Sequence, residues 1–116
     1  MVRLTVTLVA SQTHAASLLD ALQTLRRSTR IEPGCVGCFV REDIEDVTTL
    51  CYAEEWATES DMRRRIQSDR FTALLGVMEA AREFPQVQFD FVTTTRGLDY
   101  VAEVRQGTGR SLTADS

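Results

Sequence analysis

Apolar and polar side chains alternate over residues 2–10, at the start of the chain. One side of this stretch collects the apolar residues Val2, Leu4, Val6, Leu8 and Ala10. A period of two is typical of a β-strand with one buried face. The pattern therefore predicts a first strand, with Thr5 and Thr7 as hydrogen-bonding side chains on its other face.

The period changes over residues 14–29, where apolar side chains recur at helical spacing. These side chains are Ala15, Leu18, Leu19, Leu22 and Leu25. They form a single stripe, which predicts an amphipathic helix. Glu32-Pro33-Gly34 then ends the helix and turns the chain.

Two strand-like stretches follow, over residues 35–42 and 47–56, and the polar residues 43–46 between them predict a hairpin. The second stretch is apolar on both sides, with Leu50, Tyr52 and Trp56 on one and Val47, Cys51 and Ala53 on the other. We therefore expect both faces of this strand to be covered.

A helical region broken in two follows the hairpin. Thr58, with Asp61 three residues on, predicts a capped helix start, and this short helix runs to about Gln67. Ser68-Asp69 is a second capping signal. The next helix keeps its apolar residues at helical spacing: Phe71, Leu74, Leu75, Met78 and Ala81. Phe84-Pro85 closes it.

Alternation returns over residues 86–95, and again over residues 98–104, which predicts a further strand and a short fifth one. The order β-α-β-β-α-β is that of the ferredoxin-like α+β fold, an antiparallel sheet with helices on one face. We expect one domain over residues 1–105 and a polar C-terminal tail over 106–116.

The helices can cover only one face of such a sheet. A second copy of the chain is the simplest cover for the other face. We therefore predict a homodimer in which two sheets face each other and enclose a cavity.

Composition removes several classes of function. The net charge is −4, which gives no indication of a nucleic-acid or anionic membrane partner. All 13 basic residues are arginine, so Schiff-base chemistry through a lysine is excluded. Three cysteines, no visible signal peptide and no long apolar stretch lead us to expect a cytoplasmic protein with reduced thiols.

Three segments carry a resemblance to a known family. Residues 32–37 resemble the stretch that leads into the second strand of the antibiotic biosynthesis monooxygenase (ABM) family. Glu54-Glu55-Trp56 resembles the end of its third strand, and residues 68–71 resemble the joint between its helices. The resemblance spans about residues 2–95. It implies a dimeric α+β barrel and oxidation of a small aromatic molecule, often without metal, flavin or haem.

The sequence departs from this family at positions that matter for chemistry. Many members carry histidines in the second helical region, where the corresponding residues here are Arg65 and Arg70. The branch that degrades haem resembles a set of Asn, Trp and His. This chain has no asparagine, Arg65 stands at the Trp position, and Leu74, Leu75 and Val77 occupy the His region. The resemblance therefore argues against haem degradation.

The candidate substrate-binding residues are aromatic or cationic. They are Phe39, Tyr52, Trp56, Arg65, Phe71 and Phe89. Trp56 and Tyr52 either hold an aromatic ring or serve packing, which is the commoner role. If Arg65 and Arg70 point inward as the family's histidines do, they would bind an anionic substrate or stabilise a phenolate and a developing superoxide. The alternative is a solvated helix face.

The candidate catalytic residues are His14, Asp90 and Arg70. His14 is the one side chain that ordinarily titrates near neutral pH, although it stands at a predicted helix start. Asp90 is either a desolvated base or the partner of an arginine, and we favour the pairing. Cys35 and Cys38 lie three apart in a strand and should point to opposite faces, so we expect no metal site.

These residues fit a monooxygenase that needs no cofactor and uses molecular oxygen on a small phenolic or quinol-like aromatic. Such a reaction asks the protein for a dry cavity, orientation, a proton acceptor and positive charge. The alternatives are a dimeric small-molecule-binding protein without catalysis, and an oxygen-independent isomerase on the same fold.

Overall fold

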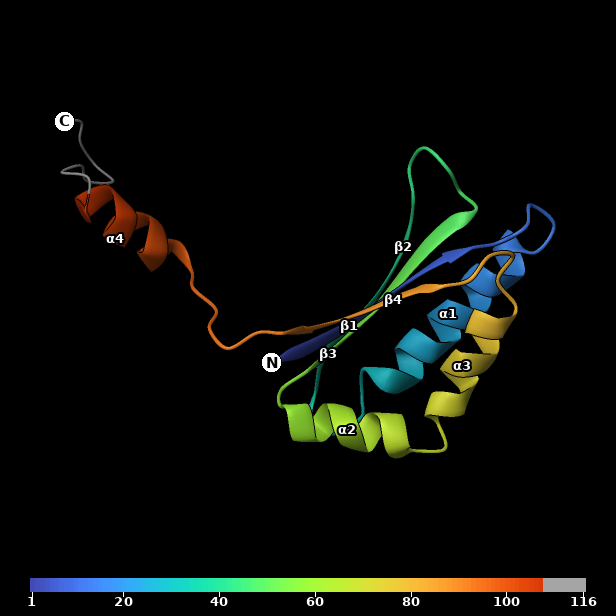
Figure 1. Cartoon of the computed structure of the whole chain (residues 1–116), viewed down its shortest axis with the longest axis horizontal. Helices are drawn as coiled ribbons and strands as arrows, with labels where there is room; N and C mark the ends of the chain where they lie inside the picture. Colours follow the sequence, from blue (N-terminus) through green and yellow to red (C-terminus); the bar gives the residue numbers. More distant parts are fainter. Residues whose placement is uncertain (108–116) are drawn as a thin grey trace.

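The computed structural model describes residues 1–107 of the chain. Four antiparallel strands form one sheet in the order β2-β3-β1-β4 (Figure 1). The strands are β1 (Val2–Val9), β2 (Cys35–Glu42), β3 (Thr49–Trp56) and β4 (Gln86–Phe91). This topology confirms the predicted ferredoxin-like α+β fold.

Three helices cover one face of the sheet (Figure 1). They are α1 (Ala15–Thr29), α2 (Glu59–Gln67) and α3 (Phe71–Glu79), so the predicted break in the second helical region is confirmed. Thr58 caps α2 as expected, because its hydroxyl accepts a hydrogen bond from the amide of Asp61 at 3.1 Å. Ser68 does not cap α3: its hydroxyl donates to the carbonyl of Arg65 at 2.7 Å, at the end of α2.

The core lies between the sheet and these helices. Val6, Leu8 and Leu22 are fully buried there, and the alternation of β1 places its apolar side chains toward α1 as predicted. The remaining buried residues of this core come from β1 and the residue after it, β2, β3 and the three helices: Val2, Leu4, Ala10, Leu18, Leu25, Cys38, Leu50, Tyr52, Trp56, Met62, Phe71 and Leu74. Leu75 was expected in the stripe of α3, but 41% of it is exposed.

The other face of the sheet, which we call the open face, is not covered by any element of residues 1–107. Strand pairing places on it the side chains of Arg3, Thr5, Thr7, Phe39, Arg41, Cys51, Ala53, Glu55, Gln88 and Asp90. Most of these are polar. Cys51 and Ala53 lie on this face of β3 as predicted, whereas Val47 lies before the start of the strand at Thr49.

Residues 98–104 form a helix, and the predicted fifth strand was wrong. Helix α4 (Leu98–Gly107) follows β4 after a short connection and stands apart from the rest of the molecule (Figure 1). The amide of Gly97 donates to Asp99 Oδ1 at 3.1 Å, which helps to start the helix. Of the predicted tail, residues 106 and 107 end α4, and residues 108–116 lie outside the described residues.

Candidate functional site

The structure separates the predicted site residues into distinct regions. Tyr52, Trp56, Arg65 and Phe71 lie together between β3 and the helices, with Arg70 at the joint of α2 and α3. The other four candidates lie elsewhere: Phe89 in a hollow beside α2, Phe39 and Asp90 on the open face, and His14 at the start of α1. A single cavity between facing sheets therefore cannot hold all of these residues.

His14 lies at the far end of the sheet from this group. Trp56 pairs with Val2 at the beginning of β1, whereas His14 follows the end of that strand. Eight strand residues put the two ends about 23 Å apart. The imidazole is exposed and within hydrogen-bonding distance of the Ser11 hydroxyl, with Nδ1 and Oγ 2.7 Å apart.

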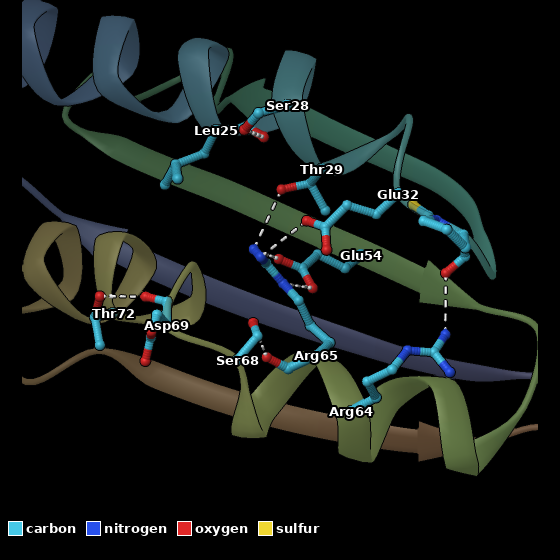
Figure 2. A network of polar contacts seen from close by, with 12 residues as sticks. Leu25, Ser28, Thr29, Glu32, Glu54, Arg64, Arg65, Ser68, Asp69 and Thr72 are labelled. Atoms are coloured by element: carbon cyan, nitrogen blue, oxygen red, sulfur yellow. Dashed lines mark hydrogen bonds and ion pairs between the residues drawn. The ribbon is translucent and has the colours of Figure 1, made fainter.

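A buried carboxylate, Glu54, organises the helix-covered side. It lies between Tyr52 and Trp56 on the inner side of β3 and is fully buried. The Tyr52 hydroxyl donates to Glu54 Oε2 at 2.7 Å, and the Trp56 indole donates to Oε1 at 3.0 Å. Arg65 donates to the same carboxylate from Nη2 at 2.8 Å and from Nε at 3.1 Å (Figure 2). Four donors therefore hold one carboxylate in a fixed position.

Arg65 is committed to this network. Its side chain is 1% exposed, and it also reaches Glu32 at 3.2 Å and the Thr29 hydroxyl at 3.2 Å. The guanidinium carbon lies 5.5 Å from the centre of the Phe71 ring. Burial by itself would lower the pKa of Arg65, but hydrogen bonding and charge attraction from Glu54 outweigh it and hold the pKa above its ordinary value. Arg65 is thus a charged structural residue with four of its five N–H donors already in use.

Tyr52 stays a neutral hydrogen-bond donor. Burial is the largest cause that raises the pKa of its hydroxyl, and the negative charge of Glu54 raises it further. A phenol in this setting does not ionise in the ordinary pH range, so Tyr52 cannot act as a base there.

A hollow of about 400 Å³ opens beside the network, at the joint of α2 and α3. We call it the joint hollow. Trp56 and Arg65 lie at its inner end, and Ser68, Asp69 and Arg70 come from the joint itself. Its remaining lining residues are Glu32, Pro33, Asp61 and Arg64.

The turn at Pro33 and Gly34 fixes one wall of this hollow. Gly34 has φ of +86°, which favours glycine, and a Cβ there would lie 2.5 Å from the Asp61 carboxylate. Arg64 Nη2 donates to Asp61 Oδ1 at 2.6 Å and to the Pro33 carbonyl at 3.2 Å. Hydrogen bonds from Thr58 and then from Arg64 hold the pKa of Asp61 below its usual value. The turn that forms this wall is therefore held against α2 by the hydrogen bonds of Arg64.

Arg70 is the cation at this hollow that remains available. It is exposed at the beginning of α3, and its guanidinium has no hydrogen bond or ion pair within residues 1–107. Arg64 and Arg65 are both held by carboxylates. Of the two arginines highlighted in the sequence, Arg65 is thus buried in the polar network around Glu54, whereas Arg70 is exposed at the edge of the joint hollow.

The open face carries a larger hollow of about 750 Å³, which includes Phe39 and Asp90. Asp90 accepts hydrogen bonds from the Gln88 side chain at 3.0 and 3.1 Å. Arg3 stands opposite Asp90 but pairs with Glu55 at 2.7 Å. The favoured pairing of Asp90 with an arginine is therefore not found among the ion pairs of residues 1–107.

The cysteines do not lie as their spacing suggests. Cys35 pairs with Trp56 and Cys38 with Glu54, so a β-bulge between Cys35 and Gly37 places both cysteines on the helix-covered side. The expectation of opposite faces was wrong for this reason. Burial raises the pKa of Cys38 to about 11, which leaves a neutral thiol at physiological pH. Within residues 1–107, no group of three or more His, Cys, Asp or Glu residues is placed to hold a metal ion.

Sequence reasoning missed Glu54 and Glu32 as site residues. A signal for Glu54 was present, because positions 52, 54 and 56 must share a side of the strand. A carboxylate between two large aromatics on an inner face requires a buried cation, and Arg65 was available on the next helix. Glu32 offered no comparable signal, since it lies in a turn.

The sequence profile of the antibiotic biosynthesis monooxygenase family matches residues 1–75. The chain therefore belongs to this family. No curated protein sequence matches it significantly.

Solved structures share the fold at low sequence identity. A protein from Deinococcus radiodurans classed with the antibiotic biosynthesis monooxygenases is similar at 23% identity and a TM-score of 0.76, over 84% of this chain and 97% of that one. PA3566 from Pseudomonas aeruginosa is 22% identical with a TM-score of 0.68, over 80% and 94%. Rv0793 from Mycobacterium tuberculosis is 15% identical with a TM-score of 0.71, over 83% and 98%. No helix among residues 1–107 has the length and apolar character needed to cross a membrane.

Proposed function

We propose that this chain is a monooxygenase that binds a small phenolic or quinol-like aromatic in the joint hollow and oxidises it with molecular oxygen, without a cofactor. The observation that carries the proposal is the pairing, in one hollow, of the Trp56 indole with the uncommitted guanidinium of Arg70. Membership of the ABM family supports the reaction class.

The chemistry places modest demands on the protein. A phenol that loses its proton becomes an electron-rich phenolate, which can pass one electron to oxygen. The phenoxyl radical and the superoxide would then combine at a ring carbon and take back the proton as a hydroperoxide, which would lose water and leave one oxygen atom on the product. Arg70 would stabilise the phenolate and the superoxide formed beside it, because a guanidinium favours both anions. Trp56 would hold the ring, and the network around Glu54 would keep Trp56 and Arg65 in place.

Glu32 is the proton acceptor that we propose. Its carboxylate lines the joint hollow, is largely buried and has one ion pair, with Arg65. Asp61 is less suited because Thr58 and Arg64 already occupy its carboxylate. His14 and Asp90 lie in other regions of the molecule and have no part in this proposal.

Oxygen uptake by the metal-free protein tests the proposal. The substrates would be a panel of dihydroxynaphthalenes, anthrones and quinols, with no cofactor added. We expect enzyme-dependent uptake that falls at least about tenfold in Arg70→Ala, since one charge contact to a developing anion is typically worth this much. Arg63→Ala is the matched control, because Arg63 lies on α2, outside the joint hollow, and pairs with Glu59.

A non-catalytic binding protein is the second candidate. It is favoured by the ion pairs of Glu32 and Asp61, because both of these carboxylates at the joint hollow already have an arginine partner. Ligand binding without oxygen uptake across the panel would replace the first proposal with this one. Conversion that proceeds equally well without oxygen would instead indicate an isomerase.

A further inference from the structure

We propose that Asp69 determines which substrates the joint hollow accepts, by binding a second hydrogen-bond donor on the aromatic ring. The preferred ligand would have one hydroxyl at Arg70 and a further hydroxyl or amino group at Asp69. The inference rests on the proposed function, because it requires that a phenolic ring binds in the joint hollow. It starts from the charged side chains of that hollow and from the partners that each of them has.

Four of the charged side chains at the joint hollow are held in pairs. Arg65 Nη1 lies 3.2 Å from Glu32 Oε2, and Arg64 Nη2 lies 2.6 Å from Asp61 Oδ1. Each of these groups is therefore oriented by an opposite charge of the protein itself. Together the two pairs add no net charge to the hollow, so they do not select a ligand by its charge.

Asp69 and Arg70 are the two charged residues that remain at this hollow. Both are exposed, and neither side chain has a hydrogen bond or ion pair within the part of the chain that the structure describes. They are consecutive in the sequence but are not paired with each other. The joint hollow thus has one free carboxylate beside one free guanidinium.

The backbone holds Asp69 in place although its carboxylate is free. The Asp69 carbonyl accepts hydrogen bonds from the amide of Thr72 at 3.1 Å and from the Thr72 hydroxyl (Figure 2). One residue earlier, the Ser68 hydroxyl donates to the carbonyl of Arg65 at the end of α2. The joint is therefore anchored to both helices, and the Asp69 side chain begins from a defined position.

A structural role at the start of α3 is the alternative for Asp69. An acidic side chain there would favour the positive end of the helix dipole. The first amides of α3, however, already have backbone acceptors: those of Phe71 and Thr72 donate to the carbonyls of Ser68 and Asp69 at 3.2 and 3.1 Å. The carboxylate of Asp69 accepts none of these amides, so it stays available to a ligand.

The two free groups suit two different substituents of one ring. Consecutive side chains at the start of a helix diverge by about 100°, which favours contacts with separate parts of a ligand. A guanidinium only donates hydrogen bonds, and a carboxylate only accepts them. Arg70 therefore suits an ionised hydroxyl, whereas Asp69 suits a hydroxyl or amino group that keeps its hydrogen. A carboxylate in that second position would be repelled.

Ligand binding without oxygen tests this inference in the absence of turnover. The probes are a dihydroxynaphthalene, the matching aminonaphthol and the matching naphthol, titrated into the full chain by calorimetry. We expect the first two to bind about tenfold more tightly than the naphthol. This is the lower end of what a hydrogen bond to a charged group contributes, because Asp69 is exposed. Asp69→Ala should remove the preference and leave the affinity for the naphthol unchanged.

Glu79→Ala is the matched control, because Glu79 is an exposed acid of α3 that lies outside the joint hollow. It should keep the preference, and thermal unfolding shows whether each variant is folded. Loss of a purely structural role of Asp69 would lower stability without changing the ratio of affinities. Equal affinities of the parent chain for the three probes would overturn the inference, and so would a preference that survives in Asp69→Ala.

The result can be separated from the fate of the oxygenase proposal. A preference that depends on Asp69, in a protein that takes up no oxygen, would support the inference and remove the proposed reaction. Oxygen uptake by a protein that binds the three probes equally would remove only the role of Asp69. A parent chain that binds none of the probes would overturn both.

Discussion

The two faces of this sheet use charged residues in opposite ways. On the helix-covered face, the side chains of Glu54 and Arg65 are buried. They form nearly all their hydrogen bonds with each other and with neighbouring side chains. On the open face, Arg3 and Glu55 form an ion pair of similar length, but Arg3 is 41% exposed. The difference teaches that an ion-pair distance alone does not tell whether a charge belongs to the frame of a protein or to its surface.

The strongest test of this contrast removes one cation from each face. Arg65→Met leaves the carboxylate of Glu54 buried and unpaired, so we expect the free energy of unfolding to fall by about 3–5 kcal/mol. Arg3→Met breaks a solvent-screened pair and should cost no more than about 1 kcal/mol. Urea unfolding of both variants measures the difference. Equal losses would show that the Glu54 network does not differ from a surface pair.

A milder test removes one neutral donor from each face. Tyr52→Phe deletes the hydroxyl that donates to Glu54 at 2.7 Å, and a hydrogen bond to a charged group contributes about 1.5–3 kcal/mol. Thr5→Val changes a hydroxyl on the open face and should alter stability by about 0.5 kcal/mol or less. Thermal and urea unfolding would compare the two. A Tyr52→Phe variant as stable as the parent would contradict the idea of a tightly held carboxylate.

The turn that borders the joint hollow gives a smaller effect. Gly34→Ala combines a left-handed backbone with a contact to Asp61, and we expect a loss of about 1–2 kcal/mol. Gly76→Ala is the matched control, because a Cβ there meets nothing within 4 Å. In the middle of α3 that change should stabilise the chain by up to about 1 kcal/mol. The same sign for both variants in urea unfolding would refute this account of Gly34.

The smallest effect is confined to high pH. The folded pKa of Cys38 is raised from 9.0 to about 11, chiefly by burial. The unfolded thiol therefore loses its proton first, and the contribution to stability that is present below pH 9 declines as the pH rises toward 11. Cys38→Ala should lose less stability than the parent between pH 8.5 and 10.5 in urea unfolding. Parallel pH profiles would show that the thiol is not desolvated.

Simple periodicity predicted most of the fold. The alternation of β1 and the stripe of α1 define the core, and the break before Phe71 marks the two short helices. Periodicity failed where the chain fits two patterns. Leu98, Tyr100, Ala102 and Val104 alternate as in a strand, whereas Leu98, Val101 and Ala102 recur at helical spacing. The local hydrogen bonds of Asp99 favour the helix.

The candidate site was less predictable because it depends on which side of an element a residue occupies. The alternation of side chains along β3 correctly placed Tyr52 and Trp56 on one face. The β-bulge between Cys35 and Gly37, however, places Cys35 on the same face as Cys38. Nothing in the spacing of Arg63, Arg64 and Arg65 tells which of them turns inward. In the structure, Arg65 is the one that turns inward, because it faces the carboxylate of Glu54 on β3 and forms an ion pair with it.

Trp56 also gives this protein an internal optical probe. It is the one tryptophan in the sequence, its indole is 1% exposed, and its N–H is bonded to Glu54 at the inner end of the joint hollow. Its emission should be blue-shifted, and an aromatic ligand in that hollow should quench it without any added label. Since no second tryptophan contributes to the emission, a change in it would report on the surroundings of this hollow alone.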